Sequence, residues 1–301
     1  MLKINEVLKK NELKPRKYIK NNNVMFIETD NGKYAVKKNS HNKHIMDYLK
    51  SRSFNYFPKI INEDEEYSIS NYIESYNIPT EQKILDLIDL VSLLHNKTTH
   101  YKEVTEDNYK EIYEHINNNI EYLYTYYTDI ITIIESKVYM SPSEYVLARN
   151  ISRIFSNLNF LKEELENWYL LVKEKKKQRL VVLHNNLELS HFISNDTNYL
   201  VSWDKAKIDI PIFDLYKLYM RHGLEFDFVE ILKRYERNYP LYEDERKLFF
   251  ILILLPQKIE IRANEYETSV EIGKMIDFLY KTQMFISPYY SEKRPENNTN
   301  K

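Results

Sequence analysis

The chain has 301 residues, of which 43% are hydrophobic and 14% aromatic, and its formal charge is −2 at pH 7. This length and composition allow a soluble protein with two lobes, while the near-neutral charge excludes a global electrostatic field that would collect nucleic acid or anionic lipid. The three glycines exclude a glycine-rich phosphate loop, and the absence of cysteine excludes disulfides, thiolate catalysis and cysteine-bound zinc.

Neither a signal peptide nor a membrane span is expected. Residues 1–14 contain no unbroken apolar core. The longest purely apolar run, residues 249–255, is much shorter than the ~20 residues that a membrane span requires. We therefore expect a cytoplasmic protein whose partners include neither nucleic acid nor a membrane.

The first part of the chain alternates short strand-like runs with helical segments. Asp30-Asn31-Gly32 lies between two alternating runs and predicts a hairpin. The expected helices cover residues 2–13 and 41–52, and the expected strands cover residues 24–28, 34–37, 59–61 and 67–73. Residues 1–75 are thus predicted to form a small antiparallel sheet that carries helices.

Helices are predicted to dominate from residue 76 to residue 285. Apolar spacing indicates helices over residues 81–98, 106–138 and 141–176, the last beginning with a capping box, Ser-Pro-Ser-Glu. The basic residues from Lys173 to Arg179 are typical of a solvated helix C-terminus, and a phosphate-binding patch is the alternative.

One segment interrupts these helices. Residues 180–184 and 199–203 are predicted as strands, with a loop and a turn between them, and a further helix begins at Pro211. The last stretch, residues 291–301, is polar and poor in apolar residues, and a disordered tail is predicted over 286–301. Strands followed by helices make the predicted fold class α+β, with a β-rich lobe over 1–75 and a helical lobe over 76–285.

The order of these pieces, with the residues at their joints, resembles the aminoglycoside phosphotransferase and choline kinase branch of the protein-kinase-like fold. It is most similar to bacterial spore-coat kinase-like proteins. The matching elements, in chain order, are YAVKK, LLHNKT, HNNLELSHF, LVSWDKA and IPIFDLYKLY. The resemblance implies a two-lobe fold, with a small N-terminal antiparallel sheet lobe, a larger helical C-terminal lobe and a catalytic loop over 184–204.

Three family positions are retained. The resemblance places Lys37 where a lysine grips the nucleotide α- and β-phosphates. His184 matches the histidine that braces the catalytic loop, and Asp214 matches the aspartate that opens the following helix and organises that loop.

The positions that carry the catalytic base, the metal ligands and the partner of the lysine differ from the family pattern. Asn186 stands at the position of the catalytic base, and an amide has no basic oxygen at neutral pH. His191 and Ser202 stand at the positions of two magnesium ligands, and neither an imidazole nor a neutral hydroxyl suits this hard cation. The helix glutamate that should pair with Lys37 is also missing, since its expected position falls near Asn42.

Asp204 is the residue that would have to substitute for the lost metal ligands. If residues 199–204 form a regular strand, Ser202 and Asp204 point to the same side, so Asp204 reaches the region that Ser202 faces. A further alternative joins His184, His191 and Asp204 in a hydrolase metal site, although their spacing matches no standard ligand motif.

We therefore expect a pseudokinase with lost or very weak phosphotransfer, which acts by binding an unknown protein partner or small molecule. The resemblance extends this expectation to a structural role in a spore coat. The alternative is a divergent ATP-dependent kinase that phosphorylates a hydroxyl group, with the metal held by Asp204 and Asp209. ATP and Mg²⁺ are the expected cofactors of an active form only.

Overall fold

A computed structural model of the chain describes residues 13–21, 24–38, 42–63, 66–262 and 264–291. The chain divides into two compact units. The first comprises Met1–Thr99, Val181–Asp209 and Arg237–Tyr239, and the second comprises His100–Leu180, Ile210–Glu236 and Pro240–Lys301. These two units are defined by which residues pack together in space. The predicted boundary near residue 75 instead marks the change from strands to helices along the chain.

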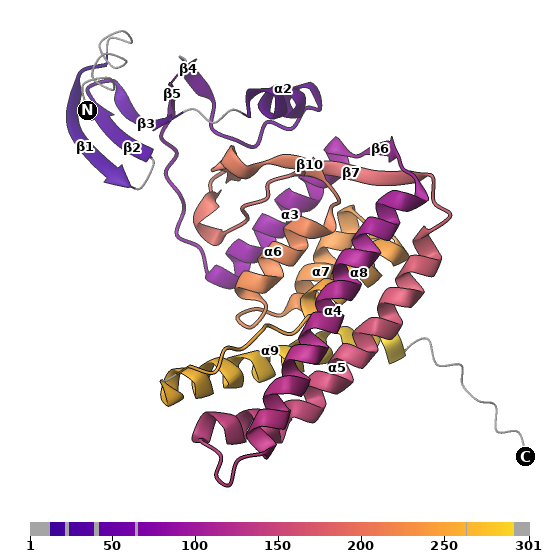
Figure 1. The fold of residues 1–301 in the computed structure, drawn as a ribbon. Helices are drawn as coiled ribbons and strands as arrows, with labels where there is room; N and C mark the ends of the chain where they lie inside the picture. The colour runs from indigo at the N-terminus through magenta and orange to yellow at the C-terminus, as the bar shows by residue number, and fades with distance from the viewer. Residues whose placement is uncertain (1–12, 22–23, 39–41, 64–65, 263, 292–301) are drawn as a thin grey trace, which may run out of the picture. The chain divides into compact units, whose positions relative to one another are not determined.

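The first unit contains a five-stranded antiparallel sheet with the strand order β1-β2-β3-β5-β4 (Figure 1). Its strands are β1 (Pro15–Asn21), β2 (Val24–Thr29), β3 (Gly32–Lys38), β4 (Ile60–Glu63) and β5 (Tyr67–Asn71). The predicted hairpin is confirmed, because Thr29 pairs with Gly32 around Asp30 and Asn31. Gly32 has a φ of 133°, a backbone conformation that residues other than glycine rarely adopt. The predicted helix over 2–13 lies, except for Leu13, outside the described residues.

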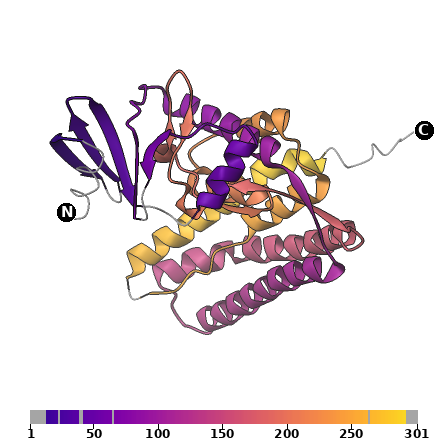
Figure 2. The same ribbon diagram turned by 90° about the horizontal axis from the view of Figure 1, so that it is seen from above.

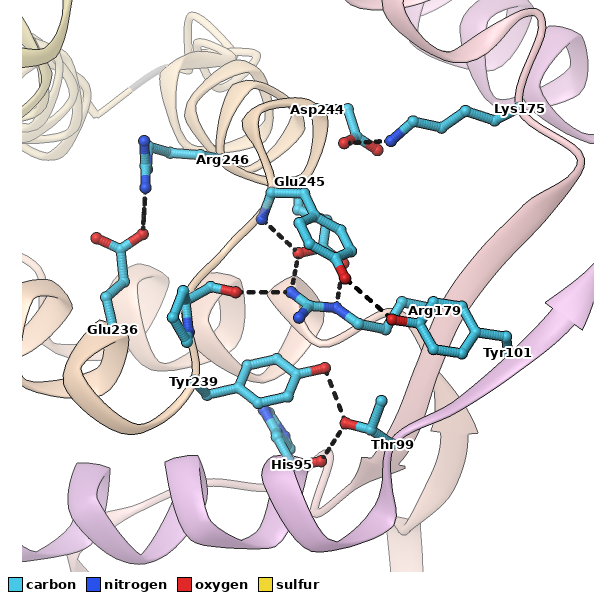
Figure 3. A network of polar contacts seen from close by, with 12 residues as sticks. His95, Thr99, Tyr101, Lys175, Arg179, Glu236, Tyr239, Asp244, Glu245 and Arg246 are labelled. Atoms are coloured by element: carbon cyan, nitrogen blue, oxygen red, sulfur yellow. Dashed lines mark hydrogen bonds and ion pairs between the residues drawn. The ribbon is translucent and has the colours of Figure 1, made fainter.

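Two helices complete the first part of this unit, α2 (Lys43–Ser51) and α3 (Thr80–Thr98). The predicted apolar face of α3 is confirmed, since it is buried from Ile84 to His95. At the end of α3, Thr99 Oγ1 donates a hydrogen bond to the His95 carbonyl at 2.7 Å and lies 3.2 Å from the Tyr239 hydroxyl (Figure 3). These contacts hold the end of α3 in place.

The remainder of the first unit consists of short elements. The last residues of β7 (Lys177–Leu183) pair with β10 (Lys207–Asp209). Between these strands lie η1 (Leu189–His191), β8 (Phe192–Ile193), β9 (Tyr199–Leu200) and η2 (Trp203–Lys205). The predicted strand over 199–203 is wrong beyond Leu200, because Ser202 adopts a left-handed conformation that ends the extended backbone.

The second unit is built around two long helices, α4 (Glu106–Glu135) and α5 (Pro142–Val172), which lie side by side in both views (Figures 1 and 2). The capping box at the start of α5 is confirmed, with Pro142 in the first turn. The other elements are β6 (His100–Glu103), α6 (Ile212–His222), α7 (Phe228–Asn238), α8 (Glu243–Leu254) and α9 (Glu265–Ser291), although the last two residues of α7 belong to the first unit. Helix α5 packs against α4, α8 and α9.

Two predicted boundaries in this unit are wrong. Helix α5 ends at Val172, and residues Lys177–Leu180 pair with β6, so part of the basic stretch belongs to a strand rather than to a helix end. Helix α9 runs to Ser291, and the buried side chain of Ile286 shows why the predicted tail cannot begin at 286. Residues 292–301 lie outside the described residues. No described helix has both the length and the apolar character needed to cross a membrane.

Candidate functional site

The predicted catalytic loop leaves β7 after Leu183 through a bend at Asn185. The φ of Asn185 is 60°, and asparagine is one of the few residues that adopt this left-handed region at low cost. Leu187 in the loop is completely buried, and the loop belongs to the first unit. The loop is therefore an ordered part of the unit that also contains Lys37.

His184, at the start of this loop, is completely buried. Its Nε2 lies 2.8 Å from the carbonyl oxygen of Val201, and its ring meets the Trp203 ring edge to face, with 4.7 Å between centroids. These contacts link the start of the loop to the segment that follows β9. The bracing role expected of His184 remains a prediction.

His191 also contacts the loop backbone. Its Nδ1 lies 2.8 Å from the carbonyl oxygen of Asn186, and its own carbonyl accepts a hydrogen bond from the Val201 amide at 2.9 Å. The imidazole nitrogen that faces the loop is thus engaged by a peptide oxygen. The loss of a magnesium ligand at this position remains a prediction.

The segment after β9 does not have the geometry that an alternating strand would give it. Ser202 has φ and ψ of 68° and 50°, and Asp204 lies in the 3₁₀ turn η2. Ser202 and Asp204 therefore do not lie on one side of a regular strand. The expectation that Asp204 replaces Ser202 as a metal ligand depended on that strand geometry.

Asp204 instead forms an ion pair with Lys37. Asp204 Oδ2 lies 2.6 Å from Lys37 Nζ, with side-chain exposures of 41% and 26%. The carboxylate thus neutralises the lysine that the resemblance assigns to nucleotide phosphates. In the family that lysine pairs with a helix glutamate, and here an acid from the loop segment is its partner.

Asn42, near the expected position of that glutamate, has a different role. It is the residue before α2, but its side chain makes no helix-capping hydrogen bond. Its Nδ2 lies 2.9 Å from the carbonyl oxygens of Trp203 and Asp204 and 3.3 Å from that of Ala206. Sequence reasoning missed this contact, because an asparagine before a helix usually indicates an N-cap.

Side chains therefore hold most carbonyl groups of residues 200–206, a stretch that we call the locked segment. Besides the three that Asn42 approaches, the carbonyl of Leu200 accepts from Trp203 Nε1 at 2.9 Å, that of Val201 lies against His184, and that of Lys205 accepts from Asn185 Nδ2 at 2.7 Å. Buried backbone carbonyls need such partners. Moving this segment to bind a metal would break several of these hydrogen bonds together.

The described residues contain no group of three histidine, aspartate or glutamate side chains arranged to hold a metal ion. The ring centroids of His184 and His191 lie 6.2 Å apart, and one nitrogen of each ring contacts a backbone carbonyl. The geometry gives no support to the hydrolase alternative.

Asp214 lies in the second unit, in the first turn of α6, and is completely buried. A carboxylate in this position interacts favourably with the positive end of the helix dipole. Its predicted role toward the catalytic loop remains a prediction.

The fold can be compared with those of known proteins. No protein-family model matches the chain, and no curated protein matches its sequence. Among solved structures, an aminoglycoside phosphotransferase from Alicyclobacillus acidocaldarius matches with a TM-score of 0.66 and 9% identity over 92% of both chains. Spectinomycin phosphotransferase in complex with AMP matches with a TM-score of 0.51 and 12% identity, over 99% of this chain and 96% of the other.

A choline kinase from Streptococcus pneumoniae also matches, with a TM-score of 0.47 and 15% identity, over 96% of this chain and 98% of the other. The first two likenesses carry the conclusion about the fold. The chain has the protein-kinase-like fold, with a small N-terminal antiparallel sheet and a larger helical part, as the sequence predicted.

Proposed function

We propose that this chain is a pseudokinase, a protein of the kinase fold with lost or very weak phosphotransfer that acts by binding a partner or a ligand. The observation that supports it best is the Lys37–Asp204 ion pair at 2.6 Å. Asp204, the substitute that the sequence offered beside Ser202, neutralises the lysine assigned to the phosphates, and Asn186 supplies no base.

The locked segment supports the same proposal. Phosphoryl transfer depends on positioned cations and carboxylates around the γ-phosphate. Residues 200–206 would have to supply a metal carboxylate, yet Ser202 carries a neutral hydroxyl and the neighbouring carbonyls are held by Asn42, His184 and Asn185. These hydrogen bonds hold the backbone of the segment in one conformation, as expected of a structural element rather than of a metal-binding one.

Titration of the protein with ATP and Mg²⁺ tests the proposal, with the melting temperature and γ-phosphate release as the two measurements. We expect little stabilisation and no phosphate release above that of a Lys37→Ala variant. Robust turnover that Lys37→Ala abolishes would overturn the proposal, because it would show that the lysine still serves catalysis.

A divergent kinase is the second candidate, because the ion pair keeps a carboxylate beside the predicted phosphate-binding lysine. Binding of Mg²⁺ and ATP could then separate the pair and use both partners. Asp209, the other acid invoked for the metal, pairs with Lys207 at 2.5 Å. Phosphorylation of a member of an alcohol and amino-sugar panel, lost in Asp204→Asn, would favour this candidate.

The resemblance to spore-coat kinase-like proteins motivates the location proposed for the pseudokinase, in the cytoplasm or associated with a spore coat. Fractionation of sporulating cells, with an antibody against the chain, tests it. Recovery of the chain in the coat fraction is the expected result, and its absence from that fraction throughout sporulation would restrict the proposal to the cytoplasm.

A further inference from the structure

A cavity of about 360 Å³ lies in the second unit, between β6, the end of α5, the start of β7 and the start of α8. Four aromatic side chains line it, those of Tyr101, Tyr109, Trp168 and Tyr242. None of its lining residues belongs to the predicted catalytic loop over 184–204. Its volume falls in the range of about 300 to 1,000 Å³ in which small-molecule sites usually lie.

The four aromatic side chains differ in their exposure to solvent. Tyr109 and Trp168 are almost completely buried, and their rings meet edge to face. Tyr101 and Tyr242 are about half exposed, and their hydroxyls form a hydrogen bond of 2.9 Å. A planar apolar group that enters from the Tyr101 and Tyr242 side would find aromatic surface to pack against.

The two acids that line the cavity are already neutralised. Arg179 bonds to both carboxylate oxygens of Glu245 (Figure 3). Both side chains are more than nine-tenths buried. Asp244 pairs with Lys175 at 2.5 Å (Figure 3). Arg179 also stacks on the Tyr242 ring, with its guanidinium carbon 4.0 Å from the ring centroid. A ligand cation would therefore find both carboxylates and this ring face occupied.

Positive charge remains at the rim. Lys176 and Lys177 line the cavity and are exposed, and within the described part of the chain neither takes part in an ion pair. Lys177 is two residues from Arg179 in the strand, so the two side chains share a face of β7. Glu103 lies opposite Lys177 in the strand register, and at such an exposed position its attraction is small.

We propose that this cavity binds a small aromatic anion, with the ring between the tyrosines and Trp168 and the anionic group at Lys176 and Lys177. A carboxylate and a phosphate monoester share this chemistry. The proposal is independent of the fate of phosphotransfer, because it uses only residues of the second unit.

The two tryptophans of the chain allow a direct test, since Trp168 lines the cavity and Trp203 belongs to the locked segment. Protein labelled with ¹⁵N-tryptophan gives one indole N–H signal for each, and a Trp203→Phe variant assigns them. Phenyl phosphate is the probe. Binding in the cavity shifts the Trp168 signal in a saturable way and leaves the Trp203 signal in place.

Three comparisons make the test decisive. Inorganic phosphate lacks the ring and benzyl alcohol lacks the charge, so each is expected to shift the Trp168 signal only at much higher concentration. Benzoate has both a ring and a charge and is expected to bind like phenyl phosphate if any anionic group suffices. An unmoved Trp168 signal at millimolar phenyl phosphate, equal binding of benzyl alcohol, or a shift of Trp203 alone would each overturn the proposal.

A charge variant separates the rim lysines from general charge effects. Lys176→Gln with Lys177→Gln is expected to weaken phenyl phosphate about fivefold to tenfold, because two charge-assisted contacts are lost. Lys110→Gln, an exposed lysine of α4 that does not line the cavity, is the matched control and should leave the affinity unchanged. Equal affinity in all three proteins would refute the assigned role of the lysines.

Discussion

The Lys37 ammonium and the Asp204 carboxylate lie 2.6 Å apart, measured between Nζ and Oδ2, although 167 residues separate them in the sequence. The pair joins strand β3 to the turn η2 within the first unit. The acid beside Lys37, the lysine predicted to bind nucleotide phosphates, thus comes from the segment after β9. In the family pattern the acid is a helix glutamate, whose expected position falls near Asn42.

The pair is expected to add little stability. Because both side chains are partly exposed, we expect Asp204→Asn to lower the free energy of unfolding by about 1 kcal/mol or less. Urea denaturation of Asp204→Asn, Lys37→Met and the double variant measures the coupling. A coupling well above 2 kcal/mol would mean that the pair is a main structural contact, contrary to this expectation.

Asn42 is expected to matter more for stability than Asp204. Asn42→Ala removes the donor that approaches three carbonyls, and we expect a loss of about 1 to 3 kcal/mol. Asn96→Ala is the control, because the Asn96 side chain makes one exposed hydrogen bond, to the Asn238 carbonyl at 2.8 Å. If the two substitutions cost the same in urea denaturation, the locked segment does not depend on Asn42.

The left-handed backbone at Ser202 predicts opposite effects for two substitutions. With a φ of 68°, Ser202 suits glycine, so Ser202→Gly is expected to leave stability unchanged or raise it by up to about 1 kcal/mol. A β-branched side chain is strained there, and Ser202→Val is expected to cost about 1 to 2 kcal/mol. Thermal unfolding compares the two; the reverse order would show that residue 202 is extended in solution.

Glu164 makes the second unit sensitive to acid. Burial opposes its ionisation, but hydrogen bonds from Lys247 and Tyr290 outweigh that effect, so its pKa is lowered from the usual 4.5. A carboxyl with a lower pKa in the folded state stabilises the protein above pH 4.5, and this stabilisation is lost as the pH falls through the folded-state pKa.

Glu164→Gln is therefore expected to cost about 3 kcal/mol at neutral pH, since it leaves Lys247 without its partner at 2.5 Å. The cost should shrink as the pH is lowered toward acid unfolding. Glu121→Gln is the control, because Glu121 and Lys162 form an exposed pair that is expected to contribute under 1 kcal/mol. A cost for Glu164→Gln that does not change with pH would contradict the assigned pKa.

Local patterns made several parts of the fold predictable. Asp30-Asn31-Gly32 specified a hairpin, Ser141 to Glu144 specified a helix start, and apolar spacing identified the buried face of α3. Each of these depends on residues close together in the chain. Strand β6 was missed because its four exposed or half-buried residues show no apolar alternation.

The candidate site was only partly predictable. The sequence showed that Asn186, His191 and Ser202 depart from the family pattern and that His184 suits a bracing role. It could not show that Asp204 would turn to Lys37, because one left-handed residue, Ser202, changes the direction of the side chains that follow.

By itself the sequence determined the elements whose signals are local, namely turns, caps and apolar faces, and the types of residue present at the matched positions. The tertiary structure alone decided the partners, because ion pairs and hydrogen bonds between distant segments depend on how the backbone brings them together. His184 therefore lies against the Val201 carbonyl, while Asn42, Asn185 and Lys37 hold the segment to which the resemblance assigns a metal ligand.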